Sequence, residues 1–378
     1  MPPELRPLGS SPMSAHAPRF ATQIVGSWSK PHWLADHELV YAKEGVWWRV
    51  PPEFLQEAQD DAVRLAVFDQ ERAGMTYVTD GEERRQTFSG HFYDLGGIDS
   101  DEQGLVTNFG GDVLEYLTMK QKVSTGDENQ RPAAPPEFRQ PRVVGPITWQ
   151  RPLVVDASRF LQGTTTARTK VTVIGPATLA LRLVDEHYGS VDQVAFAVAD
   201  ALNTELRMLD DLGIDLIQLD EPEVHFRYSQ LKDFAVEAID RAFAGIRSRR
   251  AVHMCYGYSK NIAEKRSTPV YADALDLLSA TSADAISIEY EQPKHSPDLL
   301  EHAGDKTVIL GLLDLDTEAP VETVEHVLER ARAAVEVVGP DRLELASDCG
   351  MWFLPRDHAR AKISALESAA QVLREEHS

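Results

Sequence analysis

The chain contains only two cysteines, Cys255 and Cys349, and each lies near residues that can bind a metal. Cys255 follows His253 by two positions in a run typical of a β-strand, and side chains two positions apart on a strand point to one face. A later β-rich run ends in the carboxylate Glu289, and another precedes Cys349. One nitrogen, two sulfurs and one oxygen form a donor set that suits tetrahedral zinc better than magnesium or calcium.

The composition excludes several classes of partner. The chain has 378 residues, 43% of them hydrophobic, and a formal net charge of −22 without any basic tract. Nucleic acid and anionic membrane are therefore poor partners. Residues 1–19 are rich in proline and serine and lack the apolar stretch of a signal peptide, and no run approaches the roughly 20 residues of a membrane span. We expect a cytoplasmic protein with a disordered tail over 1–19. In a reducing compartment, metal binding by the cysteines is favoured over a disulfide.

Short β-rich runs alternate with longer amphipathic stretches along the rest of the chain. The β-rich runs are Thr22–Gly26, Thr76–Asp80, Val143–Ile147, Val171–Ile174, Leu216–Leu219, Ala251–Cys255, Ala285–Glu289, Val308–Leu313 and Leu343–Ala346. The predicted helices include Pro52–Ala73, Val191–Leu212, Ser229–Ser248, Val321–Val338 and Arg356–Glu375. Repeated strand and helix predict a parallel sheet.

We predict an α/β fold, a (β/α)8 TIM barrel formed as one catalytic domain over 20–378. Nine candidate strands are one more than this barrel needs, so the first or the third is expected at the rim. An open doubly wound sheet is the alternative, but no Gly-x-Gly-x-x-Gly motif follows the first strand. The polar stretch of about 96–141 is rich in glycine and proline and reads as a long rim insertion.

Polar residues follow many of the predicted strands, and in a barrel these carboxyl ends converge on one mouth. They are Asp80, Glu82, Asp220, Glu221, His253, Cys255, Glu289, Asp314, Asp316, Asp348 and Cys349. Each acidic residue taken alone could instead cap the helix that follows. A histidine alone would more often be a hydrogen-bonded core residue, but the pairing of His253 with Cys255 favours a metal site.

The motifs as a set resemble the catalytic half of cobalamin-independent methionine synthase and its shorter single-barrel relatives. The matching segments are Ile24–Trp28, Asp80–Arg85, Val173–Thr178, Ile217–Pro222, His253–Tyr256, Ile286–Glu289 and Asp348–Gly350. Their order and spacing are those of the family over about 20–375. The resemblance implies a (β/α)8 barrel, with zinc held by the same four residues that the strand pattern indicated.

The resemblance also implies how a substrate is held. The carboxylates matching Glu82 and Asp220 bind the amino group of homocysteine in the family, and the residues matching Gly26 and Ser27 meet its carboxylate. This division is physically consistent, because an ammonium needs acceptors and a carboxylate needs donors. The alternative for Glu82 is a structural ion pair with Arg85, three residues away.

A zinc site with two cysteines and one glutamate favours thiol chemistry. A free thiol has a pKa near 8.5, and zinc binding makes the thiolate dominant at neutral pH. Two cysteinates and one glutamate carry three negative charges, one more than the positive charge of zinc. This excess negative charge keeps a bound substrate sulfur nucleophilic. Zinc hydrolases more often use a less anionic ligand set. A structural zinc is the other alternative, but the ligands are scattered over almost a hundred residues and include an exchangeable carboxylate.

Two departures from the family concern the methyl donor. Arg182 stands where the long synthase has a tryptophan proposed to stack on folate, and Asp314 and Asp316 occupy a segment where the family has a proton-donating histidine. The N-terminal half of the long enzyme also has no counterpart here. Asp316 is the candidate replacement acid. The donor is therefore methyltetrahydrofolate or a methylcorrinoid carried by a partner protein.

The sequence thus predicts a zinc-dependent methyltransferase that converts homocysteine to methionine, without interaction with nucleic acid or membrane. The first alternative is alkyl transfer to another small thiol, as in epoxyalkane:coenzyme M transferase, whose sulfonate substrate lacks an ammonium. The second is a zinc-binding barrel without catalysis. Assays with a panel of thiols would separate the three.

Overall fold

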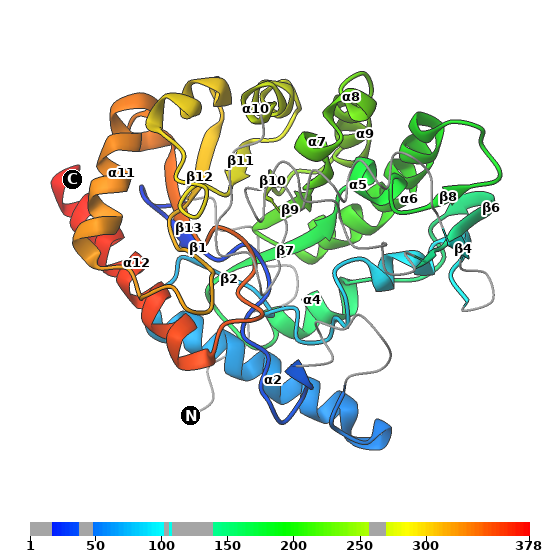
Figure 1. Cartoon of the computed structure of the whole chain (residues 1–378). Coiled ribbons are helices and arrows are strands. Elements are labelled where there is room, and N and C mark those ends of the chain that lie inside the picture. The colour runs from blue at the N-terminus through cyan, green and yellow to red at the C-terminus, as the bar shows by residue number, and fades with distance from the viewer. Residues whose placement is uncertain (1–16, 38–47, 102–105, 108–138, 257–269) are drawn as a thin grey trace.

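The computed structural model describes residues 17–37, 48–101, 106–107, 139–256 and 270–378 (Figure 1). Eight parallel strands form a nearly closed barrel surrounded by helices, which confirms the predicted (β/α)8 fold. In spatial order the strands are β1 (Thr22–Gln23), β13 (Leu343–Ala346), β12 (Thr307–Gly311), β11 (Ala285–Ile288), β10 (Arg249–Met254), β9 (Leu216–Asp220), β7 (Arg168–Ile174) and β2 (Tyr77–Val78).

Side chains and loop backbone complete the barrel between β1 and β2. The N–H of Thr22 donates to the hydroxyl of Thr76 at 3.1 Å, and the N–H of Thr76 donates to the hydroxyl of Thr22 at 3.1 Å. Further along, the N–H of Trp28 donates to the carbonyl of Gly81 at 3.0 Å. Lys170 on β7 reaches the carbonyl of Ile24 at 2.9 Å. The first candidate strand is therefore part of the barrel.

Helices cover the outside of the sheet, and their boundaries largely follow the sequence signals. They are α2 (Pro52–Ala73), α4 (Val155–Gln162), α5 (Pro176–Ala180), α6 (Val191–Leu212), α7 (Glu223–Phe226), α8 (Tyr228–Leu231), α9 (Ala235–Ala242), α10 (Tyr271–Ser279), α11 (Val324–Val338) and α12 (Arg356–Glu376), with 3-10 turns at Gly90–Asp94, Pro297–Ala303 and Pro340–Arg342. Helix α2 begins with a proline in its first turn and ends at Gly74, whose φ of 85° is left-handed.

One predicted helix is wrong in its extent. The amphipathic stretch Ser229–Ser248 is not continuous but forms α8 and α9. The N–H of Phe234 bonds to the carbonyl of Leu231 at 3.1 Å, three residues back, and the Phe234 side chain is buried. The turn between the two short helices therefore places this aromatic ring in the core.

The third candidate strand lies outside the barrel. It is part of β6 (Arg142–Thr148), which pairs antiparallel with β3 (Gly96–Asp99) and parallel with β8 (Val184–Asp185). Figure 1 shows β6 and β8 at the side of the molecule, away from β10 and β11. The described ends of the predicted insertion, about 96–141, also include β4 (Val106–Thr107) paired with β5 (Arg139–Gln140). Positions 102–105 and 108–138 of the insertion lie outside the described residues.

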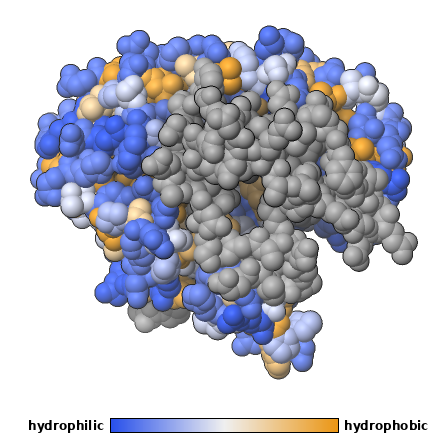
Figure 2. Space-filling view, viewed as in Figure 1, coloured by the Kyte–Doolittle hydropathy of each residue, from blue (hydrophilic) through white to orange (hydrophobic). Residues whose placement is uncertain are grey.

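The described part of the face drawn in Figure 2 is mostly polar. The coloured atoms in Figure 2 are mostly hydrophilic with scattered hydrophobic patches. No described helix is long and apolar enough to cross a membrane. Most of the predicted tail, residues 1–16 of 1–19, lies outside the described part of the chain, and the division into this tail and one domain over 20–378 stays a prediction.

Candidate metal and substrate site

Three of the predicted metal ligands come together at the carboxyl ends of two strands. His253 lies on β10, Cys255 follows that strand, and Cys349 follows β13. Their ligand atoms all lie within 4.8 Å of one another, and all three residues are buried. The sulfur atoms are 3.4 Å apart although the two cysteines are 94 positions apart in the sequence. The barrel therefore assembles a compact group of one nitrogen and two sulfurs.

This geometry fits a tetrahedral zinc ion. Zinc–sulfur bonds are about 2.3 Å long, so two thiolates on one tetrahedral zinc lie about 3.8 Å apart. The observed sulfur separation of 3.4 Å needs only a small shift to reach that value. The Nδ1 atom of His253 lies 2.9 Å from the hydroxyl oxygen of Ser287 on β11. Such a contact fixes a ligand imidazole and directs Nε2 to a metal.

The fourth predicted ligand, Glu289, lies beside the group but is not part of it. It is buried directly after β11, and its Oε2 accepts the N–H of Tyr256 at 2.8 Å. Tyr256 is the neighbour of Cys255 in the chain. The carboxylate is therefore held one residue away from a sulfur ligand.

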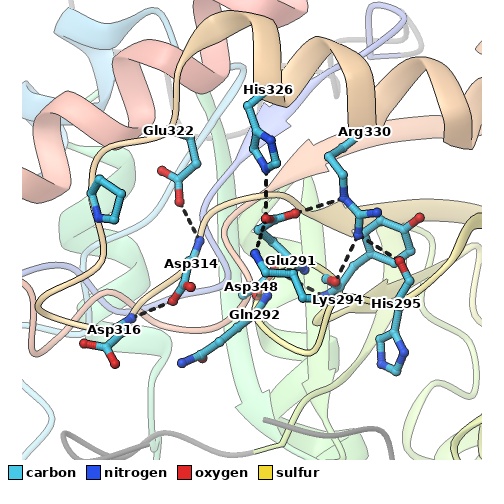
Figure 3. A network of polar contacts seen from close by, with 12 residues as sticks. Glu291, Gln292, Lys294, His295, Asp314, Asp316, Glu322, His326, Arg330 and Asp348 are labelled. Atoms are coloured by element: carbon cyan, nitrogen blue, oxygen red, sulfur yellow. Dashed lines mark hydrogen bonds and ion pairs between the residues drawn. The ribbon is translucent and has the colours of Figure 1, made fainter. Parts of the chain in front are cut away.

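Asp348 holds the loop that follows Glu289. Its Oδ1 accepts the N–H groups of Tyr290 and Glu291 at 3.2 and 2.9 Å, and its Oδ2 accepts that of Gln292 at 2.6 Å (Figure 3). Burial, together with the charge of Glu289, raises the pKa of Asp348 well above its ordinary value. The sequence allowed a helix cap at this position, and the structure instead shows a carboxylate that binds a loop between strands.

Glu291 anchors the same loop to helix α11. Its carboxylate accepts hydrogen bonds from Lys294 Nζ at 2.5 Å, from His326 Nε2 at 2.9 Å and from Arg330 Nε at 2.9 Å (Figure 3). Burial favours a raised pKa for Glu291, but these hydrogen bonds and charges hold it below its ordinary value. Arg330 also donates to the carbonyl of His295 at 2.8 Å. This network was not predicted, because two partners lie 35 and 39 positions away on another element.

Glu82 is buried in the loop after β2, beside the end of β1. Its Oε1 accepts hydrogen bonds from Arg85 at 3.1 Å and from the hydroxyl of Thr172 at 2.7 Å. A Cβ atom at Gly26 would collide with Oε1, so only glycine leaves room for the carboxylate. The ion pair with Arg85 that the sequence allowed is present. It does not exclude substrate binding, because a carboxylate has about four acceptor positions.

Asp220 ends β9 inside the barrel. Its Oδ1 accepts the amide of Gln218 at 2.7 Å. Burial, followed by the negative charge of Glu82, raises the pKa of Asp220 to about 7, against the attraction of Lys170. The two carboxylates thus repel each other within one buried region, and a substrate ammonium would relieve that repulsion.

Ser27 lies between the β2 loop and the loop of the second cysteine. It forms an isolated parallel bridge with Gly81, and its carbonyl accepts the N–H of Met351 at 2.9 Å. A Cβ atom at Gly350 would collide with the Ser27 hydroxyl. The predicted Gly26 and Ser27 pair therefore lies beside both the Glu82 carboxylate and the turn after Cys349.

The remaining acidic candidates make local turns. The carboxylate of Asp80 accepts the N–H of Glu82 at 2.9 Å, and that of Asp314 accepts the N–H of Asp316 at 2.9 Å. Asp316 is partly exposed, and its Oδ1 accepts the N–H of Glu318 at 2.8 Å. These contacts link Asp316 to neighbouring residues of its own loop and not to either cysteine.

Sequence reasoning missed the role of Glu221. Its buried carboxylate accepts the N–H groups of Ala177 and Thr178 at 3.0 and 2.7 Å, at the start of α5. A Cβ atom at Gly175 would collide with it. Burial raises the pKa of Glu221 to about 7, although the amide hydrogen bonds oppose this. The glycine before Pro176 was the available signal.

Comparisons with known proteins identify relatives that cover almost the whole chain. The family described as "Cobalamin-independent synthase, Catalytic domain" matches residues 20–372. A methionine synthase of Sulfurisphaera tokodaii is 28% identical over 361 residues, which cover 95% of this chain and 94% of that protein.

Solved structures show the same likeness. A B12-independent methionine synthase from Shewanella sp. W3-18-1, in complex with selenomethionine, is 31% identical, with a TM-score of 0.79 and coverage of 95% of this chain and 99% of that one. A putative vitamin-B12 independent methionine synthase from Listeria monocytogenes is 18% identical, with a TM-score of 0.68 and coverage of 95% and 98%, and supports the fold alone.

Proposed function

Because the chain belongs to the family of cobalamin-independent methionine synthase catalytic domains and is a methyltransferase, we propose that it methylates the thiol of homocysteine to give methionine. The observation that carries this proposal is the buried group of one imidazole and two thiols within 4.8 Å. We assign this group to zinc. Glu289 is the proposed fourth ligand, and the substrate thiol would compete with it for the metal.

The donor set explains why the acceptor is a thiol. His253, Cys255 and Cys349 would hold zinc, which supplies a Lewis acid that keeps a substrate thiol deprotonated near pH 7. Because the two cysteinates already balance the metal charge, the charge of Glu289 makes the site electron-rich. Such a site suits a nucleophilic sulfur better than an activated water.

Buried carboxylates explain why the thiol belongs to an amino acid. Glu82 and Asp220 would accept hydrogen bonds from the ammonium of homocysteine, and Gly26 and Ser27 would meet its carboxylate. The raised pKa of Asp220 supports this role, since a bound cation would offset the repulsion from Glu82. The Shewanella relative binds selenomethionine, the selenium analogue of the proposed product.

Two classes of methyl donor suit the proposal, methyltetrahydrofolate and a methylcorrinoid protein. Asp316 would donate a proton only to a folate leaving group, whose nitrogen must take up a proton as its bond to the methyl group breaks. Arg182 lies 3.3 Å from Glu223, with its guanidinium 5.3 Å from the centre of the Phe88 ring. Single-turnover assays with methyltetrahydrofolate and with methylcobalamin distinguish the two donors.

A thiol panel tests the acceptor. Zinc-loaded protein is supplied with methyl donor and with homocysteine, its des-amino analogue or coenzyme M. The proposal requires methylation of homocysteine at the highest kcat/KM. A higher kcat/KM for coenzyme M would instead support the first alternative, alkyl transfer to another small thiol. Absence of turnover of homocysteine with either methyl donor would overturn the proposal.

A further inference from the structure

Lys30 lies in the loop after β1, where its side chain is buried and contacts the loop that carries Glu82. Its side chain is fully buried, and its Nζ donates to the carbonyl oxygen of Glu82 at 2.6 Å. The same Nζ lies 3.8 Å from Oε2 of Glu83, whose side chain is also fully buried. Burial lowers the pKa of Lys30 and raises the pKa of Glu83 to about 8, so the short hydrogen bond to the Glu82 carbonyl, and not the longer contact with Glu83, fixes the ammonium.

Two tryptophan rings face the same ammonium. Nζ of Lys30 lies 4.9 Å from the ring centre of Trp352 and 5.6 Å from that of Trp48, within the range of a cation–π contact. Trp352 lies three residues after the proposed ligand Cys349. Lys30 therefore connects the loop of the proposed ammonium acceptor with the loop of a proposed metal ligand.

Glu82 needs such support because its backbone is strained. Its φ is 55°, in the left-handed region that residues other than glycine rarely adopt. The carboxylate of Asp80 accepts its N–H at 2.9 Å, while Lys30 and the N–H of Arg85 donate to its carbonyl, the latter at 2.9 Å. Both polar groups of this backbone are thereby fixed, and so is the direction in which the carboxylate leaves the chain.

We propose that Lys30 is a positioning residue for substrate recognition, which holds Glu82 in its strained conformation and registers it against the Cys349 loop. The inference rests on the proposed function, because it concerns the same ammonium pocket. Lys30 does not touch the substrate in this scheme. It acts on the distance between the ammonium acceptor and the sulfur site, which must match one substrate molecule.

A purely structural ion pair with Glu83 is the competing explanation, and two variants separate it from the proposal. Lys30→Met removes both the hydrogen bond to Glu82 and the ion pair. Glu83→Gln replaces the carboxyl group of this pair with a neutral amide and leaves the donation from Lys30 to Glu82 in place. The two proteins are compared at equal zinc content and equal content of folded protein by circular dichroism.

The measured quantity is amine discrimination, the kcat/KM for homocysteine divided by that for its des-amino analogue. We expect Lys30→Met to lower this ratio about tenfold, because the carboxylate of Glu82 loses its alignment with the ammonium. Glu83→Gln should keep the ratio of wild type, and Lys30→Arg, which retains a cationic donor, should restore most of it. An unchanged ratio in Lys30→Met, or an equal loss in Glu83→Gln, overturns the proposal.

Glu82→Gln is measured in parallel so that the two proposals can fail separately. If Glu82→Gln keeps full discrimination, the assignment of Glu82 to the ammonium is wrong and the role of Lys30 falls with it. If Glu82→Gln loses discrimination and Lys30→Met does not, only the positioning role is wrong. Should Lys30→Met fail to fold, Lys30→Met combined with Glu83→Gln removes the unpaired carboxylate, and the same ratio decides.

Discussion

Replacing Asp220 with asparagine should weaken substrate binding and stabilise the ligand-free protein. The side chain is buried at the end of β9, where burial and the charge of Glu82 raise its pKa from 3.8 to about 7. Between these values the folded protein holds a proton that the unfolded chain has released. The free energy of unfolding therefore falls as the pH rises from about 4 to about 7.

The magnitude follows from that difference. A pKa change of about 3 corresponds to about 4 kcal/mol of unfolding free energy at pH 8. Asp220→Asn removes this cost. It keeps an Oδ1 acceptor for the Gln218 amide, which donates to Asp220 at 2.7 Å in the wild-type protein. Lys170 loses an attractive charge in the variant, which offsets part of the gain. We expect a net stabilisation of about 1 to 3 kcal/mol at pH 8 and almost none near pH 4.

Urea unfolding of the zinc-loaded, ligand-free proteins at several pH values measures this difference. Calorimetric titration with methionine measures binding, for which we expect an affinity about ten- to a hundredfold lower in the variant, since a charge-assisted hydrogen bond to the ammonium is lost. The control variant is Glu301→Gln, which neutralises an exposed carboxylate. Gln218→Glu is not used, because it adds a charge. A variant less stable than wild type at pH 8, or a gain of equal size at pH 4, would refute the reasoning.

Three further predictions concern the metal and its surroundings. Cys255→Ser and Cys349→Ser should each lose most of the bound zinc while circular dichroism still reports a folded barrel, because the large core does not depend on the metal; full zinc occupancy in both would contradict the ligand assignment. Homocysteine binding near pH 7 should release close to one proton from zinc-loaded protein and almost none from metal-free protein, as measured by calorimetry in buffers of different ionisation enthalpy; a release independent of metal would contradict thiolate formation. Asp348→Ala should destabilise the fold by at least about 3 kcal/mol in urea unfolding, because three buried N–H groups lose their acceptor; a loss below about 1 kcal/mol would show that the loop finds other partners.

The barrel could be predicted from local pattern because its strands are buried on both faces. Strands such as 285–288 read as short apolar or β-branched runs, and the helices between them repeat apolar residues at three and four positions. Which of nine candidates lay outside was beyond local pattern. Residues 143–147 are as β-prone as the others, and only pairing with β3 and β8 assigns them to a separate sheet.

The site divides in the same way. The spacing of His253 and Cys255 determined that they share a face, because strand geometry is local. The approach of Cys349 to 3.4 Å depended on the tertiary structure, because β12 and β11 lie between β13 and β10 in the sheet. Glu289 illustrates the limit, since the sequence placed it at a strand end but the Tyr256 N–H determines where its carboxylate points.

The sequence by itself determined the fold class, the residue types of the candidate metal site and the family, because these depend on periodicity and on motifs a few residues long. The tertiary structure alone decided which polar groups meet. Lys30 reaches Glu82 across 52 positions, and Asp348 binds amides 56 to 58 positions away. Such contacts depend on how loops from separate strands pack in a low-dielectric interior, where each buried polar group must find a partner. No local pattern records that requirement.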